Sequence, residues 1–187
     1  MSDATAITTV AEFYQQISVD GSEDDALIQG LIDRETEMFT KYCEIESFFI
    51  GTYIEQHDGN ATHNLFVKNY PVNSIAEIAV DSDWLFATES VIDTSDYKIV
   101  DDRYVAYKSL FSSGLQNIRI TYTAGYSVIP VDIVAVMLQE IVKNYARRKE
   151  PDVVIKTLTD GSTHFTPSGL MPSTKQVLDK YKKMRAN

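Results

Sequence analysis

The sequence predicts an α+β fold in which helices pack together and a small antiparallel β-sheet is inserted between them. Apolar residues recur every three or four positions over about 23–43 and 131–149, as in amphipathic helices. The segment between them, 49–123, consists of short alternating runs rich in β-branched and aromatic residues, which is typical of antiparallel strands. Finally, "TYTAGYSVIPVDI", residues 121–133, ends a strand and opens a helix within one short turn.

The first long helix is predicted from about residue 23 to 43. Ser22 is a favoured N-cap, and three acidic residues follow it in the first turn, where negative charge favours the helix dipole. The apolar stripe consists of Leu27, Ile28, Leu31, Ile32, Met38, Phe39 and Tyr42. Gly30 lowers helix propensity, and tight packing against a neighbouring element would explain its presence. A shorter and weaker helix is expected within residues 4–19.

The strands follow from residue 48 onward. The run "FFIGTYIEQHDGNATHNLFV" predicts a strand, a turn at Asp58-Gly59-Asn60 and a second strand. "NYPVNSIAEIAV" predicts another strand after Pro71, and "DYKIVDDRYVAY" predicts a short hairpin over two aspartates. The loop at 81–96 is acidic and carries Trp84. These elements together predict a small sheet of short antiparallel strands.

The last strand leads directly into the second long helix. In "NIRITYT" the alternation places three apolar side chains on one face, which we expect to be buried: Ile118, Ile120 and Tyr122. A strand–helix joint follows, consisting of Gly125, Tyr126 and Pro130. The glycine can adopt positive φ, and the proline is well placed at a helix start. The joint is either a rigid connection that an assembly requires or an ordinary link between a strand and a helix.

Three segments are expected along the 187 residues. Residues 1–21 form a partly flexible N-terminal segment, residues 22–150 form the core domain, and residues 151–187 form an extended arm with a short basic helix. That helix would combine apolar and basic residues: Val177, Leu178, Tyr181, Lys175, Lys180, Lys182, Lys183 and Arg185. A segment that cannot bury its apolar side alone tends to become ordered on a partner, so this set is the predicted partner-binding surface.

Charge is divided unevenly along the chain. The net charge is −10, but residues 1–102 hold 21 acidic and 4 basic residues, whereas residues 103–187 hold 6 acidic and 13 basic residues. Such a chain can meet a copy of itself head to tail, with an acidic surface against a basic one. The alternative is that both are solvated faces without a partner.

Cellular location is also bounded by composition. No apolar run approaches the ~20 residues of a membrane span, and the N-terminus lacks the pattern of a secretory signal, so we expect no membrane partner. A single cysteine, Cys43, excludes an internal disulfide and fits a reducing compartment. Cys43 is expected to be a small buried apolar group rather than a reactive thiol.

No strong signal for catalysis is present. His57 and His63 flank a turn, where a metal could use them with Asp58, but exposed turn residues are the simpler interpretation. The sequence has neither a glycine-rich phosphate loop nor a nucleophile elbow. The 11 tyrosines suit packing at sheet and interface edges better than a stacking platform for bases. We therefore assign no catalytic, cofactor-binding or metal-binding residues.

The order of these elements resembles the head–tail connector proteins (adaptor or head-completion proteins) of tailed bacteriophages and prophages. The resemblance runs from about residue 22 to 149 and is most specific in "LFVKNYPVNSI", Leu65 to Ile75, and "TYTAGYSVIPVDI". It implies a non-enzymatic virion protein that assembles as a ring, often a dodecamer, from subunits that are monomers when free. The 81–96 loop and the C-terminal arm depart from the family pattern.

The resemblance also implies partners and a location. The ring would join the portal protein to a tail-side stopper or tail-completion protein, with DNA passing through the pore without specific binding. Its place would be the virion head–tail junction, and the host cytoplasm during assembly. Two other classes stay open: a small soluble ligand-binding or hydrolytic α+β domain, and a nucleic-acid-binding protein that uses the basic C-terminal tail. The acidic N-terminal half argues against the latter, because affinity for phosphate grows with the number of bases engaged.

Overall fold

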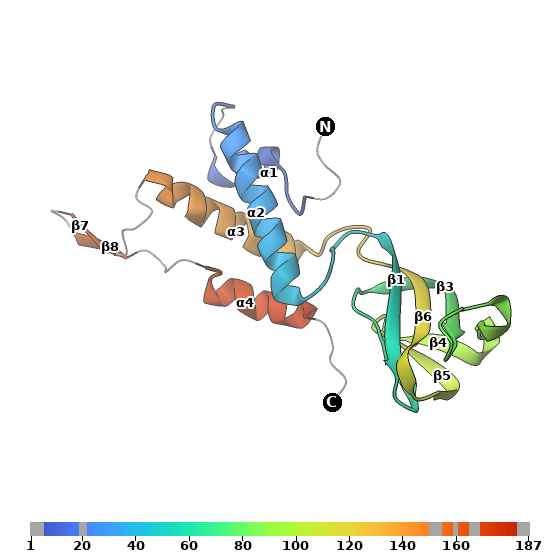
Figure 1. The fold of residues 1–187 in the computed structure, drawn as a ribbon. Helices are drawn as coiled ribbons and strands as arrows, with labels where there is room; N and C mark the ends of the chain where they lie inside the picture. The colour runs from blue at the N-terminus through green and yellow to red at the C-terminus, as the bar shows by residue number, and fades with distance from the viewer. Residues whose placement is uncertain (1–5, 19–21, 150–154, 159–160, 165–168, 183–187) are drawn as a thin grey trace. The chain divides into compact units, whose positions relative to one another are not determined.

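The computed structural model describes residues 6–18, 22–149, 155–158, 161–164 and 169–182. The chain divides into two compact units. The first, here called the helical unit, comprises residues 1–43 and 129–181, and the second, the β-unit, comprises residues 44–128 together with 182–187. The sequence had predicted one core domain over 22–150, whereas helices from both ends of the chain here form a unit of their own (Figure 1).

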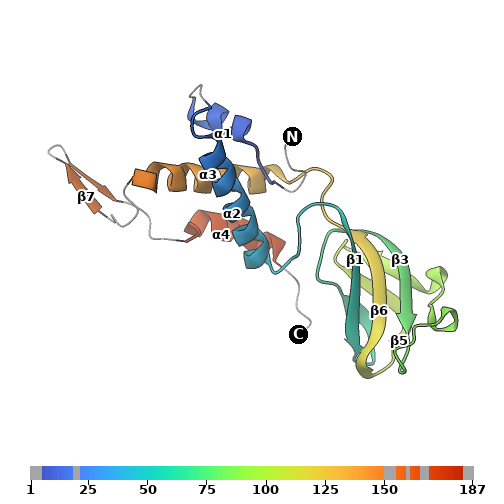
Figure 2. The same cartoon turned by 45° about the horizontal axis from the view of Figure 1, so that its top comes forward.

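The helical unit is built around one central helix. Its α-helices are α1 (Val10–Ile17), α2 (Asp25–Cys43), α3 (Val131–Ala146) and α4 (Pro172–Leu178), with a 3₁₀ turn after each of the last two. Helix α3 contacts each of the other three, and the crossing of α2 over α3 is visible in both ribbon views (Figures 1 and 2). The interior contains Phe13, Ile28, Ile32, Phe39, Ile133, Met137, Ile141 and Leu178. The predicted apolar stripes of α2 and α3 therefore pack in the interior, except that Leu27 of the α2 stripe is 42% exposed.

The β-unit consists of two three-stranded antiparallel sheets. One has the order β1–β6–β3, from β1 (Gly51–Gly59), β6 (Gly114–Ala124) and β3 (Val72–Val80). The other has the order β2–β5–β4, from β2 (Thr62–Phe66), β5 (Tyr104–Phe111) and β4 (Tyr97–Val100). Two 3₁₀ turns, Thr88–Ser90 and Thr94–Asp96, interrupt the acidic loop that precedes β4.

Both sheets contribute to one apolar core. Leu65 and Val105 from one sheet share a buried cluster with Ile78, Ile120 and Tyr122 from the other. Ile118, Ile120 and Tyr122 are all at most 1% exposed, so the predicted inward face of the last strand is confirmed. The α+β class is also confirmed, but the strands form two sheets instead of the single sheet that was expected.

The C-terminal part differs most from the expected arm. Residues Ile155–Leu158 and Gly161–His164 form a two-stranded antiparallel hairpin, β7–β8. Helix α4 lies within the helical unit and not in a separate segment, because Leu178 and Thr174 are fully buried there. Cys43 is likewise buried, at the end of α2, as predicted. Within the described residues, the helices are too short or too polar to cross a membrane.

Candidate assembly surfaces

Helix α4 is attached to the rest of the helical unit through its apolar side and through its C-terminal turn. Leu178 is fully buried. Just beyond it, the Tyr181 hydroxyl donates to the Asp132 carboxylate at the start of α3 over 2.7 Å. The Tyr42 hydroxyl of α2 donates to Asp179 over 2.9 Å. These contacts fix α4 against both α2 and α3.

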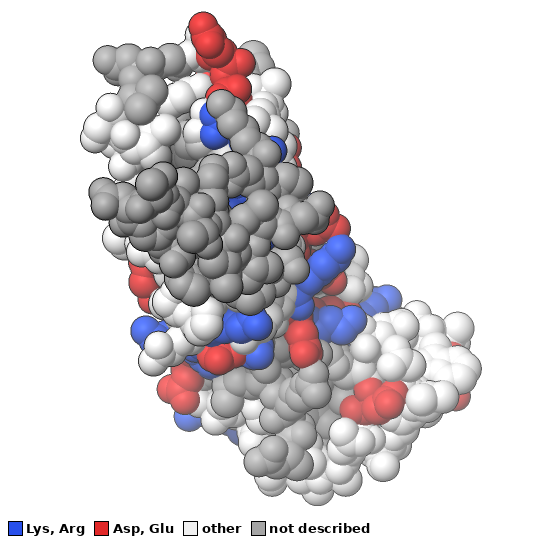
Figure 3. All heavy atoms as spheres, turned by 90° about the vertical axis from the view of Figure 1, so that its left-hand side faces the viewer, with Lys and Arg blue, Asp and Glu red and all other residues white. Residues whose placement is uncertain are grey.

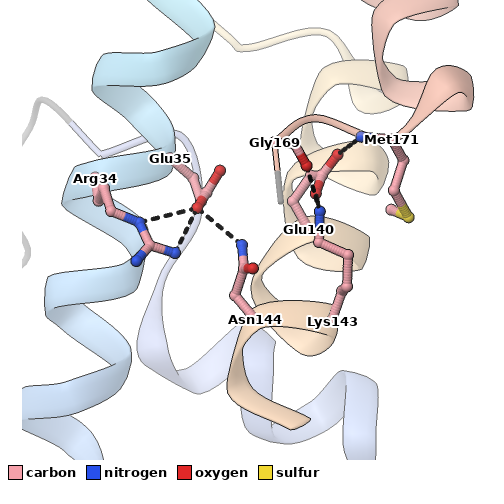
Figure 4. A network of polar contacts seen from close by, with 7 residues as sticks. All are labelled: Arg34, Glu35, Glu140, Lys143, Asn144, Gly169 and Met171. Atoms are coloured by element: carbon pink, nitrogen blue, oxygen red, sulfur yellow. Dashed lines mark hydrogen bonds and ion pairs between the residues drawn. The ribbon is translucent and has the colours of Figure 1, made fainter. Parts of the chain in front are cut away.

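A buried carboxylate holds the segment that enters α4. Glu140 of α3 is fully buried, and its Oε1 accepts a hydrogen bond of 2.6 Å from the backbone N–H of Met171 (Figure 4). Lys143, one turn along α3, forms an ion pair with Glu140 and donates to the carbonyl of Gly169 over 2.7 Å. Lys143 thus compensates the charge of Glu140, and the two side chains together bind the backbone of Gly169 and Met171 in the segment that leads into α4.

A second buried carboxylate joins α2 to α3. Glu35 is 1% exposed, and its Oε1 accepts hydrogen bonds from the Arg34 guanidinium, over 2.8 Å, and from the Asn144 amide, over 2.9 Å (Figure 4). Its other oxygen, Oε2, has no partner among the groups that the structure describes. Burial of a charged group requires such partners, so this network ties the orientation of α3 to that of α2.

The structure separates the predicted partner-binding residues into three groups. Leu178 is fully buried inside the helical unit, where α4 packs against α2 and α3, so its side chain is not accessible to a partner. Val177, Tyr181 and Lys182 are half-buried, whereas Lys175 and Lys180 are exposed. Lys183 and Arg185 lie outside the described residues. The exposed members are therefore the basic ones.

Figure 3 shows the molecule from the left-hand side of Figure 1, and on this face Lys and Arg side chains gather with Asp and Glu side chains between them. Lys175 and Lys180 of α4 are both exposed. Lys180 is 66% exposed, and its ammonium lies 3.9 Å from the Asp132 carboxylate, an exposed ion pair of the kind that contributes little stability in water.

The strand–helix joint has the predicted backbone geometry. Gly125 has a φ of +116°, and its N–H donates to the carbonyl of Pro71 over 2.9 Å. The N–H of Tyr126 donates to the carbonyl of Phe48 over 2.8 Å. Pro130 is the N-cap of α3. The stiffness of the joint, and any role in assembly, stay predictions.

The β-unit contains a buried polar network that was not predicted from the sequence. Glu55 is 5% exposed, and its carboxylate accepts hydrogen bonds from the Tyr122 hydroxyl (2.5 Å) and from the backbone N–H of Lys68 (3.1 Å), with the His57 ring 2.8 Å away. Burial tends to raise the pKa of Glu55, but the hydrogen bonds outweigh it and lower the pKa below its usual value. Burial, with the bond to Glu55, raises the pKa of Tyr122.

The interpretation of His57 as an exposed turn residue was wrong. Its side chain is only 17% exposed and lies beside Glu55 within β1, because this strand continues to Gly59. The alternation of Tyr53, Glu55 and His57 was the available signal, since it places all three on one face. His63 is exposed as expected, with its ring 2.7 Å from the carbonyl of Ser109. The side chain of His164 lies outside the described residues.

A pocket of 430 Å³ lies beside the acidic loop of the β-unit. Its lining includes Glu89, Asp93, Asp96, Tyr107 and Leu110, and contains no histidine or cysteine. The backbone N–H of Ser95 lowers the pKa of Asp93, the opposite of what a general acid requires. Among the described residues, no cluster of three or more metal-ligating side chains occurs.

Three solved structures are similar in fold: the neck of an empty GTA particle computed with C6 symmetry (15% identity, TM-score 0.60, covering 99% of this chain and 95% of the other), the virion of a native gene transfer agent (GTA) particle (14%, 0.61, 100% and 95%), and the neck of a native GTA particle computed with C12 symmetry (14%, 0.61, 99% and 94%). No curated protein gave a significant match.

The sequence itself matches the family described as "head completion protein" over residues 6–184. This match includes both units, and with them α4, the β7–β8 hairpin and the acidic 81–96 loop that had departed from the expected pattern. The chain therefore belongs to the head completion protein family and is a structural protein of the virion head–tail junction.

Proposed function

We propose that copies of this chain assemble as a ring of twelve between the portal protein and a tail-side stopper or tail-completion protein, with DNA passing through the ring. Membership of the head completion family supports a place at this junction. The similar proteins come from particles computed with C6 and C12 symmetry, which supports a ring of six-fold or twelve-fold order. The function is structural, and we assign no catalytic step to it.

The portal contact is assigned to the exposed basic face of α4, which contains Lys175 and Lys180. One observation carries this assignment: Leu178 of α4 is buried within the helical unit, whereas Lys175 and Lys180 of the same helix are exposed. A helix held in this way presents its charges on a rigid surface, so little conformational entropy is lost when a partner binds. The partner surface on the portal would be acidic.

Charge reversal tests this assignment. The double variant Lys175→Glu/Lys180→Glu should melt like the native protein, because both side chains are exposed, and should lose capture by immobilised portal rings. The matched control is Lys68→Glu/Lys98→Glu, which makes the same change in net charge on exposed lysines of the β-unit. The control should be captured normally. Undiminished capture of the α4 variant would contradict the assignment.

The same variants distinguish the nucleic-acid-binding alternative. A protein whose main function is to bind DNA through the C-terminal tail would retain duplex DNA at about 0.15 M salt and lose it with the α4 lysines, because phosphate binding depends on the number of bases engaged. The proposed function predicts that the native protein retains DNA only weakly and without preference for any DNA sequence. Gel retardation with and without the α4 substitutions measures the difference.

A further inference from the structure

Strand β1 has an open edge. It lies at the end of its sheet, where β6 pairs with it on one side and no second strand pairs with it among the described residues. It is nine residues long, and its Ile54 is 70% exposed, with Ile50 just before it 54% exposed. A long edge strand with exposed apolar side chains is a template for pairing with another chain.

The other strand edges of the β-unit are blocked or short. The outer edge of β3 is occupied near its end, where the N–H of Ile92 donates to the carbonyl of Ile78 over 2.8 Å. Near its start, the N–H of Val72 donates to the carbonyl of Asp102 over 2.7 Å. The edges of the second sheet, β2 and β4, are only five and four residues long. Among the described strands, β1 is thus the edge with the most unpaired backbone.

The β7–β8 hairpin lacks a third strand to pair with among the described residues. Its strands of four residues each pair with one another, from Ile155 opposite His164 to Leu158 opposite Gly161. Neither strand packs extensively against another described element. A two-stranded hairpin on its own is at best marginally stable in water, and a third strand or a packed face is what makes such an element persist.

We propose that the β7–β8 hairpin of one copy adds to the open edge of β1 in a neighbouring copy and extends its sheet. This inference rests on the ring proposed above and names the contact between its subunits. Main-chain hydrogen bonds from a strand added at an edge give affinity without requiring a particular side chain. The hairpin belongs to the helical unit and β1 to the β-unit, so two different surfaces of the chain meet, and such a contact, repeated head to tail from copy to copy, can close into a ring.

Amide hydrogen exchange of free and assembled protein gives the first test. In assembled necks, amides of residues 51–59 should exchange at least tenfold more slowly than in free subunits, together with those of the hairpin. The variant Thr157→Pro breaks the hairpin but no other described element, since β7 pairs only with β8. If this variant assembles, the amides of residues 51–59 should no longer exchange more slowly than in free subunits. Unchanged exchange at residues 51–59 on assembly of the native protein would overturn the proposal.

Disulfide trapping between two variants that each carry one introduced cysteine tests whether the contact joins different copies. Gln56→Cys, exposed on β1, is co-assembled with Thr157→Cys or Ser162→Cys in the hairpin, while the buried Cys43 stays in place. Oxidation should give a covalent dimer with at least one hairpin variant. The matched control, Ala76→Cys, lies exposed on β3 at the other edge of the same sheet and should give none. Equal trapping at Ala76→Cys would contradict the proposal.

An edge-blocking variant separates failure of this contact from failure of the proposed function. Ile54→Lys places a charge on the open edge without filling the core and should reduce ring incorporation, whereas Ala76→Lys should not. If the native protein is absent from necks altogether, the proposed function is wrong. If it is present but Ile54→Lys incorporates normally and no trapping occurs, the ring stands and the hairpin contact is wrong.

Discussion

Tyr122 donates a hydrogen bond of 2.5 Å to Glu55 in the interior of the β-unit, across a sequence separation of 67 residues. The two residues come from neighbouring strands, β1 and β6, where Tyr53 and not Glu55 is directly opposite Tyr122. The same hydroxyl accepts a hydrogen bond of 3.1 Å from the N–H of Asn69. The pair therefore connects one sheet to the segment that leads into β3.

Removing this hydroxyl should destabilise the β-unit. Tyr122→Phe leaves the buried carboxylate of Glu55 with one donor fewer and leaves the N–H of Asn69 unsatisfied, which should cost about 1–3 kcal/mol of unfolding free energy. Tyr107→Phe, on a half-buried tyrosine of the same unit, is the control and should change stability by less than about 0.5 kcal/mol. Urea unfolding monitored at Trp84, the single tryptophan, reports on this unit. Equal losses in both variants would argue against the network.

Stability should depend on pH in a direction set by the same pair. The pKa of Glu55 is lowered in the folded state, so the unfolded chain binds more protons at acidic pH. The contribution of Glu55 is thus present above its ordinary pKa of 4.5 and is lost as pH falls through the folded value. The pKa of Tyr122 is raised from 10.0, so its contribution is lost as pH rises above 10. Denaturation at several pH values measures both limbs, and Glu55→Gln should flatten the acidic one.

Two glycines should respond to alanine in opposite ways. Gly125 has a positive φ, and a Cβ there would lie 2.2 Å from the carbonyl oxygen of Phe49, so Gly125→Ala should cost more than about 2 kcal/mol. Gly30 lies within α2, and a Cβ there would have nothing within 4 Å. Within this chain, close packing therefore does not account for Gly30, contrary to the expectation from the sequence. Gly30→Ala should stabilise the helical unit by about 0.5–1 kcal/mol. Thermal melts of both variants measure these two opposite changes in stability.

The C-terminal helix should prove to be part of the folded helical unit. Because Leu178 is fully buried, Leu178→Ala should destabilise that unit by about 2–5 kcal/mol. Deletion of residues 170–187 should lower the melting temperature for the same reason, so it cannot separate docking from folding. Deletion of residues 183–187 is the matched truncation and should leave the melt unchanged. An unchanged melting temperature after deletion of residues 170–187 would instead support the original prediction of an arm separate from the folded core.

The sequence alone determined those elements whose buried face follows from a local repeat of apolar residues. Alternation identified the buried face of Ile118, Ile120 and Tyr122, and three- and four-residue spacing identified α2 and α3. Gly125 and Pro130 marked the joint because their backbone restrictions are intrinsic to the residue. These features need no knowledge of what the element packs against.

Tertiary structure decided which faces meet. The spacing of apolar residues shows that Leu178 lies on an apolar side of its helix, but not that this helix packs against α2 and α3, so the prediction of an extended arm was wrong at α4. Likewise, alternation places Glu55 inward, but its charge is tolerable only because Tyr122 and the N–H of Lys68 arrive from elsewhere in the chain. The division into two sheets and two units depends on such long-range contacts, whose free energy is gained only when the distant segments are brought together.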